Sequence, residues 1–323
     1  MRNKNRRACT ITAVALLLAS LAIATMSVRG GNSPEIVVVI DYDAADELPE
    51  GIAVDKVGDL YVSLNPLGQL LKYRPDGSDP VLLLDLDGMA FGLAVDAPGN
   101  VYMAHWSPGL PSTGVYRVSR DGSIEQLPGT EDILWPNALA FDKRGNLYVT
   151  DSEGGAIWRI PRGGSAELWL QHEYLEGLGE IPGFPPVGAN GIAYWHGSLY
   201  VANTEKGLIV QIPILKSGEP GEPLIIAEEG LYGLDGIALD VHGNIYAVLV
   251  LQNKLVKVDP SSGDFTVILT ADDGLNMPAS LAFGTGKGNR QSVYIINFSL
   301  MGPGGLGQAV LKVNVDVPGQ PIP

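Results

Sequence analysis

The chain has 323 residues, of which 46% are hydrophobic and only 18% are charged, a balance that excludes an intrinsically disordered protein. Acidic residues outnumber basic ones by 36 to 21, giving a formal net charge of −15, so nucleic acid and anionic lipid are unfavourable partners. The 41 Gly and 23 Pro, spread between short apolar runs, favour β-strands joined by turns.

Residues 1–30 differ in kind from the rest of the chain. A basic head in residues 2–7 precedes an apolar run in residues 8–28, the pattern of a signal peptide. Ala22-Ile23-Ala24 fits a small-residue cleavage site, but about 20 apolar residues also suffice for an uncleaved N-terminal anchor. We therefore expect an extracytoplasmic protein (secreted, periplasmic or anchored) that meets a membrane only through this segment. The only cysteine, Cys9, lies here, so the remainder has no disulfide.

The rest of the chain is dominated by an internal repeat. A phrase that first reads Pro49-Glu50-Gly51-Ile52-Ala53-Val54-Asp55 recurs about every 45 residues. A Gly-containing turn follows, as at Gly145-Asn146, and then a strand such as Leu147-Tyr148-Val149 and two further strands. Four antiparallel strands per repeat make a propeller blade. The six copies, which predict an all-β, six-bladed β-propeller, begin at Pro49, Ala90, Pro136, Ala189, Leu234 and Pro278.

The two ends of the repeat region predict how the ring closes. The last unit supplies only three strands and ends at Val310–Val313, while the apolar run Ile36–Ile40 precedes the first full unit. We expect Ile36–Ile40 to be the outer strand of the last blade, because this pairing protects an open edge. The propeller then spans residues 34–317 and leaves residues 318–323 as a C-terminal tail. We expect a monomer.

One position of the repeat carries side chains that differ between blades. The second residue of each phrase, called the ring position below, starts an innermost strand beside the central channel, on the face that also carries the long connections. Two carboxylates and two amides at this position suit a hard cation such as Ca²⁺, although another divalent cation is an alternative. Asn and Asp are also frequent in tight loops for purely structural reasons. The six residues are Glu50, Phe91, Asn137, Asn190, Asp235 and Ala279.

The phrase and its Gly-Asn-Leu-Tyr-Val continuation resemble NHL repeats, and the order Glu50, Asn137, Asn190, Asp235 resembles a narrower group. In this order of residues the chain is similar to the senescence marker protein/gluconolactonase/luciferin-regenerating enzyme family, and to diisopropyl fluorophosphatase and paraoxonase. This resemblance implies a catalytic divalent cation, usually calcium, with Glu50, Asn190 and Asp235 as core ligands and Asn137 as a ligand or substrate contact. It also implies that Asp235 activates water or attacks the substrate directly.

The chain departs from that family where a sugar lactone would be held. Trp135 stands two residues before Asn137, where gluconolactonase-type members have an arginine nearby, and Phe91 is also apolar. A more apolar substrate is therefore favoured, with Phe91 and Trp135 as substrate contacts. His105, on a loop of the same face, and Asp151 are further substrate-binding candidates, each equally explicable as a loop or turn residue.

Two functions lead from the sequence, and other propeller chemistry, such as a strictosidine-synthase-like or lyase activity, is a further alternative. The first is an exported, calcium-dependent hydrolase of a lactone, ester or phosphotriester acting on a small-molecule substrate at the central channel. The alternative is a non-catalytic, exported NHL-like propeller that binds a ligand or a protein. Glu50 and Asp235 separate the two, because a simple scaffold needs neither carboxylate.

Overall fold

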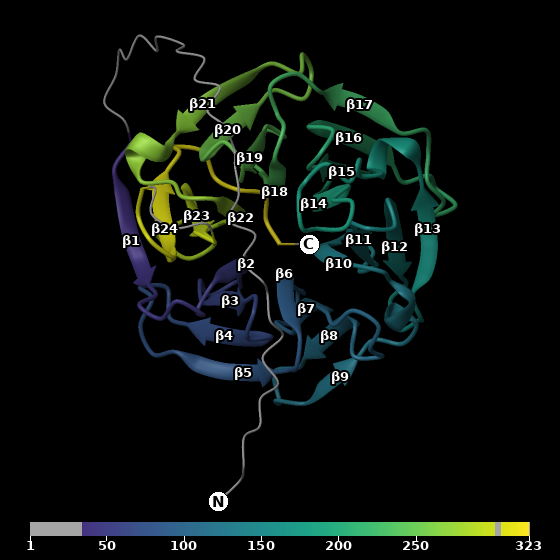
Figure 1. Cartoon of the computed structure of the whole chain (residues 1–323), viewed down its shortest axis with the longest axis horizontal. Helices are drawn as coiled ribbons and strands as arrows, with labels where there is room; N and C mark the ends of the chain where they lie inside the picture. The colour runs from purple at the N-terminus through teal and green to yellow at the C-terminus, as the bar shows by residue number, and fades with distance from the viewer. Residues whose placement is uncertain (1–33, 301–304, 323) are drawn as a thin grey trace, which may run out of the picture. The chain divides into compact units, whose positions relative to one another are not determined.

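A computed structural model describes residues 34–300 and 305–322. These residues form six four-stranded antiparallel sheets. Figure 1 shows the sheets around a common centre, with β2, β6, β10, β14, β18 and β22 innermost. Each innermost strand contacts the next one, and β22 contacts β2, so the ring of blades is closed. The predicted all-β, six-bladed β-propeller is confirmed.

The strand bounds follow the repeat. Blades one to three consist of β2 (Pro49–Val54), β3 (Leu60–Leu64), β4 (Gln69–Tyr73) and β5 (Val81–Asp85); β6 (Met89–Val95), β7 (Val101–Trp106), β8 (Gly114–Val118) and β9 (Ile124–Gln126); and β10 (Pro136–Phe141), β11 (Leu147–Asp151), β12 (Ala156–Ile160) and β13 (Glu167–Gln171). Blades four to six consist of β14 (Ala189–Trp195), β15 (Ser198–Asn203), β16 (Leu208–Pro213) and β17 (Leu224–Ala227); β18 (Leu234–Leu239), β19 (Ile245–Leu249), β20 (Lys254–Val258) and β21 (Phe265–Leu269); and β22 (Pro278–Phe283), β23 (Ser292–Asn297), β24 (Ala309–Asn314) and β1 (Ile36–Asp41).

The N-terminal strand closes the ring as predicted. β1 pairs antiparallel with β24, with Ile36 opposite Val313 and Ile40 opposite Val310. This strand therefore completes the last blade from the other end of the chain, and the two ends of the repeat region stabilise each other.

The repeated phrase ends in an aspartate because the next turn needs one. Asp142 accepts hydrogen bonds from the backbone N–H groups of Arg144 and Asn146, at 2.8 and 2.9 Å, and from the Asn146 side chain at 2.8 Å. Gly145 lies in the same turn with φ of 83°, in the left-handed region that favours glycine. One carboxylate thus accepts the hydrogen bonds of several groups of the same turn. The equivalent aspartates, each of which binds its own turn, are Asp55, Asp96 and Asp240.

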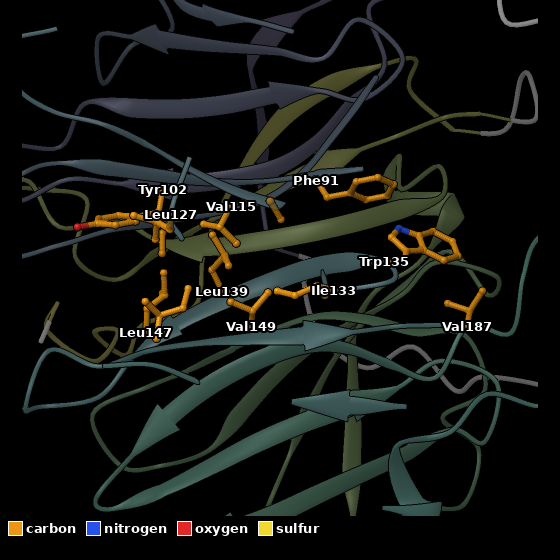
Figure 2. Packing of buried hydrophobic residues seen from close by; sticks show 13 residues of the cluster. Phe91, Tyr102, Val115, Leu127, Ile133, Trp135, Leu139, Leu147, Val149 and Val187 are labelled. Carbon is orange, nitrogen blue, oxygen red and sulfur yellow. The ribbon is translucent and has the colours of Figure 1, made fainter. Parts of the chain in front are cut away.

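The hydrophobic core lies between neighbouring blades. Leu147 and Val149 of β11 pack against residues of blade two, whereas Tyr148 between them packs towards blade four. Figure 2 shows the cluster shared by blades two and three. A strand buried on both faces needs apolar side chains at consecutive positions, which explains the Leu-Tyr-Val runs of the repeat.

The long connections lie on one face of the ring, at the start of the innermost strands. The three short 3-10 helices of the described residues lie in connections between blades on this face, at Thr130–Asp132, Glu173–Leu175 and Ala271–Asp273. We call it the loop face, and the opposite one the turn face. No helix within residues 34–300 or 305–322 is long and apolar enough to cross a membrane. The predicted signal peptide or anchor, residues 1–30, lies outside the described residues.

The C-terminal tail is bound to the turn face of blade five. The Val241 N–H donates to the carbonyl of Pro318 at 3.0 Å, and the Gln320 N–H donates to the carbonyl of Leu239 at 2.9 Å. Gly319 forms an isolated β-bridge with Asp240. Residues 318–320 are therefore held by backbone hydrogen bonds.

We predict that Ile40→Ala lowers the free energy of unfolding by about 3 kcal/mol, because Ile40 is buried in the core between blades six and one. Urea denaturation followed by circular dichroism measures this. Val37→Thr, on the same strand but exposed, should change stability by less than about 0.5 kcal/mol. Equal effects of the two substitutions would show that this strand does not close the ring through its buried side.

Candidate functional site

Every ring position lies in an interruption of its strand pairing. In blade one the pairing jumps from Pro49 to Ile52, so Glu50 lies outside the regular ladder. Register shifts fall at the same place in the other five described blades. A β-bulge turns a side chain away from its regular direction, and bulges are common beside functional sites. A small residue follows the ring position in every repeat, and in four of the six it is a glycine, which inside a strand is a signal of a bulge.

Glycines bring neighbouring ring positions together. A Cβ on Gly191 would lie 2.2 Å from the carbonyl oxygen of Asp235, and one on Gly51 would lie 2.4 Å from that of Phe91. A Cβ on Gly92 would lie 2.6 Å from the carbonyl oxygen of Asn137. A side chain at these positions would push the innermost strands apart. The glycine after the ring position therefore sets how closely the candidate ligands approach one another.

Glu50 and Asp235, from blades one and five, interact electrostatically across the ring. Glu50 is 7% exposed, and its Oε2 has no hydrogen-bond partner among the described residues. Burial, followed by the negative charge of Asp235, holds the pKa of Glu50 well above its usual range. Burial also raises the pKa of Asp235, and a hydrogen bond from Asn190 opposes this shift. A buried carboxylate oxygen without a partner is unfavourable, and a bound cation would remove that cost.

The amide of Asn190 has a defined orientation. Thr204 donates its hydroxyl hydrogen to the Leu234 carbonyl at 2.6 Å, so its oxygen must accept from Asn190 Nδ2, at 3.0 Å. This leaves Asn190 Oδ1 as the acceptor side of the amide. Asn137, the other amide of the ring position, is buried at 4% exposure. The four predicted ligands thus offer carboxylate and amide oxygens, which fit a hard divalent cation.

The described residues contain no cluster of three or more His, Cys, Asp or Glu side chains placed to hold a metal ion. A cation site at the ring position would not meet this criterion, because only two of its four polar residues, Glu50 and Asp235, are of these types and the other two are asparagines. A soft or borderline metal would need the missing ligands, whereas a hard cation accepts amide oxygens.

His105 and Asp151 occupy equivalent positions, opposite the residue that precedes the ring position. The carboxylate of Asp151 accepts from the N–H groups of Leu134, Trp135 and Gly154, at 3.1, 2.9 and 2.9 Å. Its oxygens are thus committed to holding the Trp135 segment. Asn203 stands at the equivalent position in blade four, where its side-chain amide donates to the backbone of the preceding connection.

The sequence predicted that His105 lies on a loop, and this prediction is wrong. His105 lies within β7, where its side chain is fully buried. Its Nδ1 lies 2.8 Å from the carbonyl oxygen of Ser112, and burial lowers the pKa of the imidazole. A Cβ on Gly88 would lie 2.6 Å from His105 Nε2, so backbone covers the ring closely. The side chain lies in the interior of the blade because β7 continues through His105 to Trp106 instead of ending before it.

The predicted substrate contacts Phe91, at the ring position of blade two, and Trp135 lie close together, as Figure 2 shows. Their ring centroids are 5.7 Å apart in an edge-to-face arrangement. Trp135 is also stacked between Trp106, at 4.6 Å, and Phe184, at 6.4 Å, with an interplanar angle of 13° on each side. We call these four residues the aromatic wall. Trp135 is 4% exposed, and its Nε1 has no acceptor among the described residues.

Trp106 and Phe184 were not found from the sequence. Trp106 lies one residue beyond the repeat-equivalent His105, and Phe184 lies in the irregular connection between β13 and β14. No periodicity marks either position, and only the fold brings them to Trp135.

Exposed apolar side chains are unevenly distributed between the two faces. Among the described residues, only Val57 and Leu215 are large, apolar and exposed on the turn face. The loop face carries eight, which we call the apolar rim: Leu110, Leu134, Leu178, Phe184, Tyr232, Leu251, Leu300 and Leu306. The loop face is therefore the face on which an apolar ligand or partner would meet exposed apolar side chains.

A groove of about 690 Å³ between blades one and two does not belong to this site. It opens on the turn face and is lined by Asp55, Asp96 and Lys72. Both aspartates bind their own turns, and Lys72 forms an ion pair with Asp59 at 2.7 Å. Asp55, Asp96 and Lys72 are thus already bound within the fold, and the ring position is the candidate functional site.

No protein-family model matches the chain, and no curated protein matches it. Solved structures do. A gluconolactonase from Xanthomonas campestris superposes with a TM-score of 0.65 over 89% of this chain and 90% of that one, at 18% identity. The calcium-binding protein regucalcin from Agrobacterium tumefaciens gives 0.64 over 86% and 93%, at 15% identity. Virginiamycin B lyase from Staphylococcus aureus gives 0.55 over 81% and 84%, at 16% identity.

The chain therefore has the gluconolactonase- and regucalcin-like propeller fold that the ring-position residues had indicated. At these identities the likeness establishes the fold alone. The virginiamycin B lyase match also shows that this fold supports more than one reaction, so the function must be argued from the residues of the site.

We predict that Ca²⁺ at 100 times its dissociation constant raises the free energy of unfolding by about 2.7 kcal/mol, and that Glu50→Gln removes most of this gain. With chelator, Glu50→Gln should be no less stable than the wild type, because it removes a buried carboxylate that lacks a partner. Urea denaturation with and without Ca²⁺ measures both effects. Glu229→Gln, on an exposed loop-face residue, is the matched control and should respond to Ca²⁺ like the wild type.

Proposed function

We propose that this protein is an exported, calcium-dependent hydrolase of a lactone, an ester or a phosphotriester. The observation that carries the proposal is the buried, unpartnered Glu50 Oε2, whose carboxylate interacts electrostatically with that of Asp235 at the centre of a propeller. A scaffold has no use for two desolvated carboxylates in one place, whereas a cation site requires them. The gluconolactonase and regucalcin matches support this assignment.

The residues have separable roles in the proposed reaction. Glu50, Asn137, Asn190 and Asp235 would hold the cation, which when bound polarises a carbonyl or phosphoryl oxygen of the substrate. Asp235 is the more exposed of the two carboxylates, so it can take the proton of an attacking water at the channel mouth. Asn190, oriented by Thr204, donates a hydrogen bond that keeps the Asp235 carboxylate in place.

Export rests on the N-terminal sequence. The basic head and apolar run of residues 1–30 support translocation, after which the propeller would meet extracellular concentrations of calcium. Extracellular modules commonly bind Ca²⁺ weakly, with dissociation constants of about 10⁻⁴ to 10⁻³ M. A site with only two carboxylates is consistent with that range.

We predict that the purified protein hydrolyses aryl esters, lactones or paraoxon in the presence of Ca²⁺, and that chelator abolishes this turnover. Asp235→Asn should lower kcat by about 10²- to 10⁴-fold, because it removes a general base while keeping the shape of the side chain. Asp79→Asn, on an exposed turn-face residue, is the control and should retain full activity. The proposal would be falsified if no calcium-dependent turnover is found and Ca²⁺ leaves thermal stability unchanged; a non-catalytic binding propeller would then be the better description.

A further inference from the structure

Glu205 is a buried carboxylate that the proposed chemistry does not use. It lies in the connection between β15 and β16 and is 3% exposed. Its Oε2 accepts hydrogen bonds from the backbone N–H groups of Leu178 and, at 2.7 Å, of Gly179. Its Oε1 accepts from those of Glu180 and Ile181, at 2.9 and 3.0 Å. Four consecutive backbone donors on one carboxylate make a rigid anchor.

The charged form of Glu205 is the one that the fold favours. Burial by itself raises the pKa of this carboxyl, but the four backbone hydrogen bonds outweigh burial and lower it. Glu205 is therefore ionised at neutral pH, and its charge is balanced by backbone dipoles. No basic side chain is needed to hold it.

The anchored segment is the connection between β13 and β14, residues 172–188. Ile181 packs against the core cluster of blades two and three, and Phe184 stacks on Trp135. The backbone N–H of Glu205 also donates to the Val187 carbonyl at 3.3 Å, so Glu205 binds both halves of the connection. The aromatic wall is complete only while residues 172–188 keep this course.

Glu205 is also next to the residue that orients a candidate ligand. Thr204 accepts a hydrogen bond from Asn190 Nδ2, and Glu205 follows it in the same tight turn. One turn of blade four therefore positions both an amide of the ring position and the loop that carries Phe184. The turn that contains Thr204 and Glu205 therefore fixes Asn190 of the ring position and Phe184 of the aromatic wall relative to each other.

We propose that Glu205 is a positioning residue that sets substrate specificity. By fixing residues 172–188 it places Phe184 against Trp135, and the exposed edge of the aromatic wall at Phe184 then receives an aromatic or alkyl group of the substrate next to the bond that is cleaved. The inference rests on the proposed hydrolase function for its chemistry. The apolar rim around the same face favours such a group over a polar sugar.

The activity test compares two substrates in the full-length protein. Glu205→Gln keeps the size of the side chain but replaces one acceptor oxygen with a donor that faces backbone N–H groups. It should raise KM for a phenyl-substituted lactone about tenfold, with kcat nearly unchanged, and leave kcat/KM for unsubstituted γ-butyrolactone within about twofold. Glu229→Gln is the matched control, and both substrates should behave as with the wild type.

A second pair of variants tests the inference even if Glu205→Gln does not fold. Phe184 is 42% exposed, so Phe184→Ala should leave the propeller intact and reproduce the KM effect on the phenyl lactone. Phe184→Leu, which keeps an apolar side chain, should restore part of the preference. Equal losses on the two substrates, or unchanged KM for the phenyl lactone in both Glu205→Gln and Phe184→Ala, would overturn the inference.

A binding measurement separates this inference from the proposed function. The fluorescent probe N-phenyl-1-naphthylamine should bind Glu205→Gln and Phe184→Ala about tenfold more weakly than Glu229→Gln. If no hydrolysis is detected but probe binding shows this order, the aromatic subsite stands and the hydrolase assignment falls. If all variants bind the probe equally, Glu205 does not shape the subsite, whatever the activity.

Discussion

The structure depends on how closely neighbouring innermost strands approach one another. At Gly51, Gly92 and Gly191 a Cβ would lie 2.2–2.6 Å from a backbone carbonyl of the next blade, so only glycine permits the observed packing. The contact falls one residue after the ring position, inside a β-bulge. The same close packing that closes the ring therefore also brings side chains from different blades to its centre.

Close packing at the centre has an electrostatic cost. Glu50 and Asp235 are near enough to raise the pKa of Glu50, and Glu50 Oε2 has no partner among residues 34–300 and 305–322. Elsewhere the described fold treats buried carboxylates differently: Asp142 binds a turn, Asp151 binds the Trp135 segment and Glu205 binds four consecutive backbone N–H groups. Glu50 Oε2 is thus the buried carboxylate oxygen that the described fold leaves without a partner, which is why we propose a cation at the ring position.

Buried polar side chains at the ends of the second strands connect the blades to their loops. Asp151 and Asn203 occupy equivalent positions and satisfy backbone groups of the connections before the third and fourth blades. The His105 side chain contacts the Ser112 carbonyl, which lies in the connection between β7 and β8 of blade two. From the sequence, His105 and Asp151 were interpreted as substrate contacts or as loop residues, because a polar residue near the mouth of a channel is compatible with either role. In the structure all three side chains form hydrogen bonds with backbone groups of connections on the loop face.

The sequence by itself determined the repeat, the number of blades, the closure by Ile36–Ile40 and the residues at the ring position, because each of these is a local pattern that recurs or completes a count. The turn aspartates are local for the same reason, since Asp142 and the N–H groups that donate to it lie within a few residues of one another. Only the tertiary structure decided which distant groups meet. The stacking of Phe184 on Trp135 and the anchoring of residues 178–181 by Glu205 involve irregular connections, and no periodicity encodes such contacts.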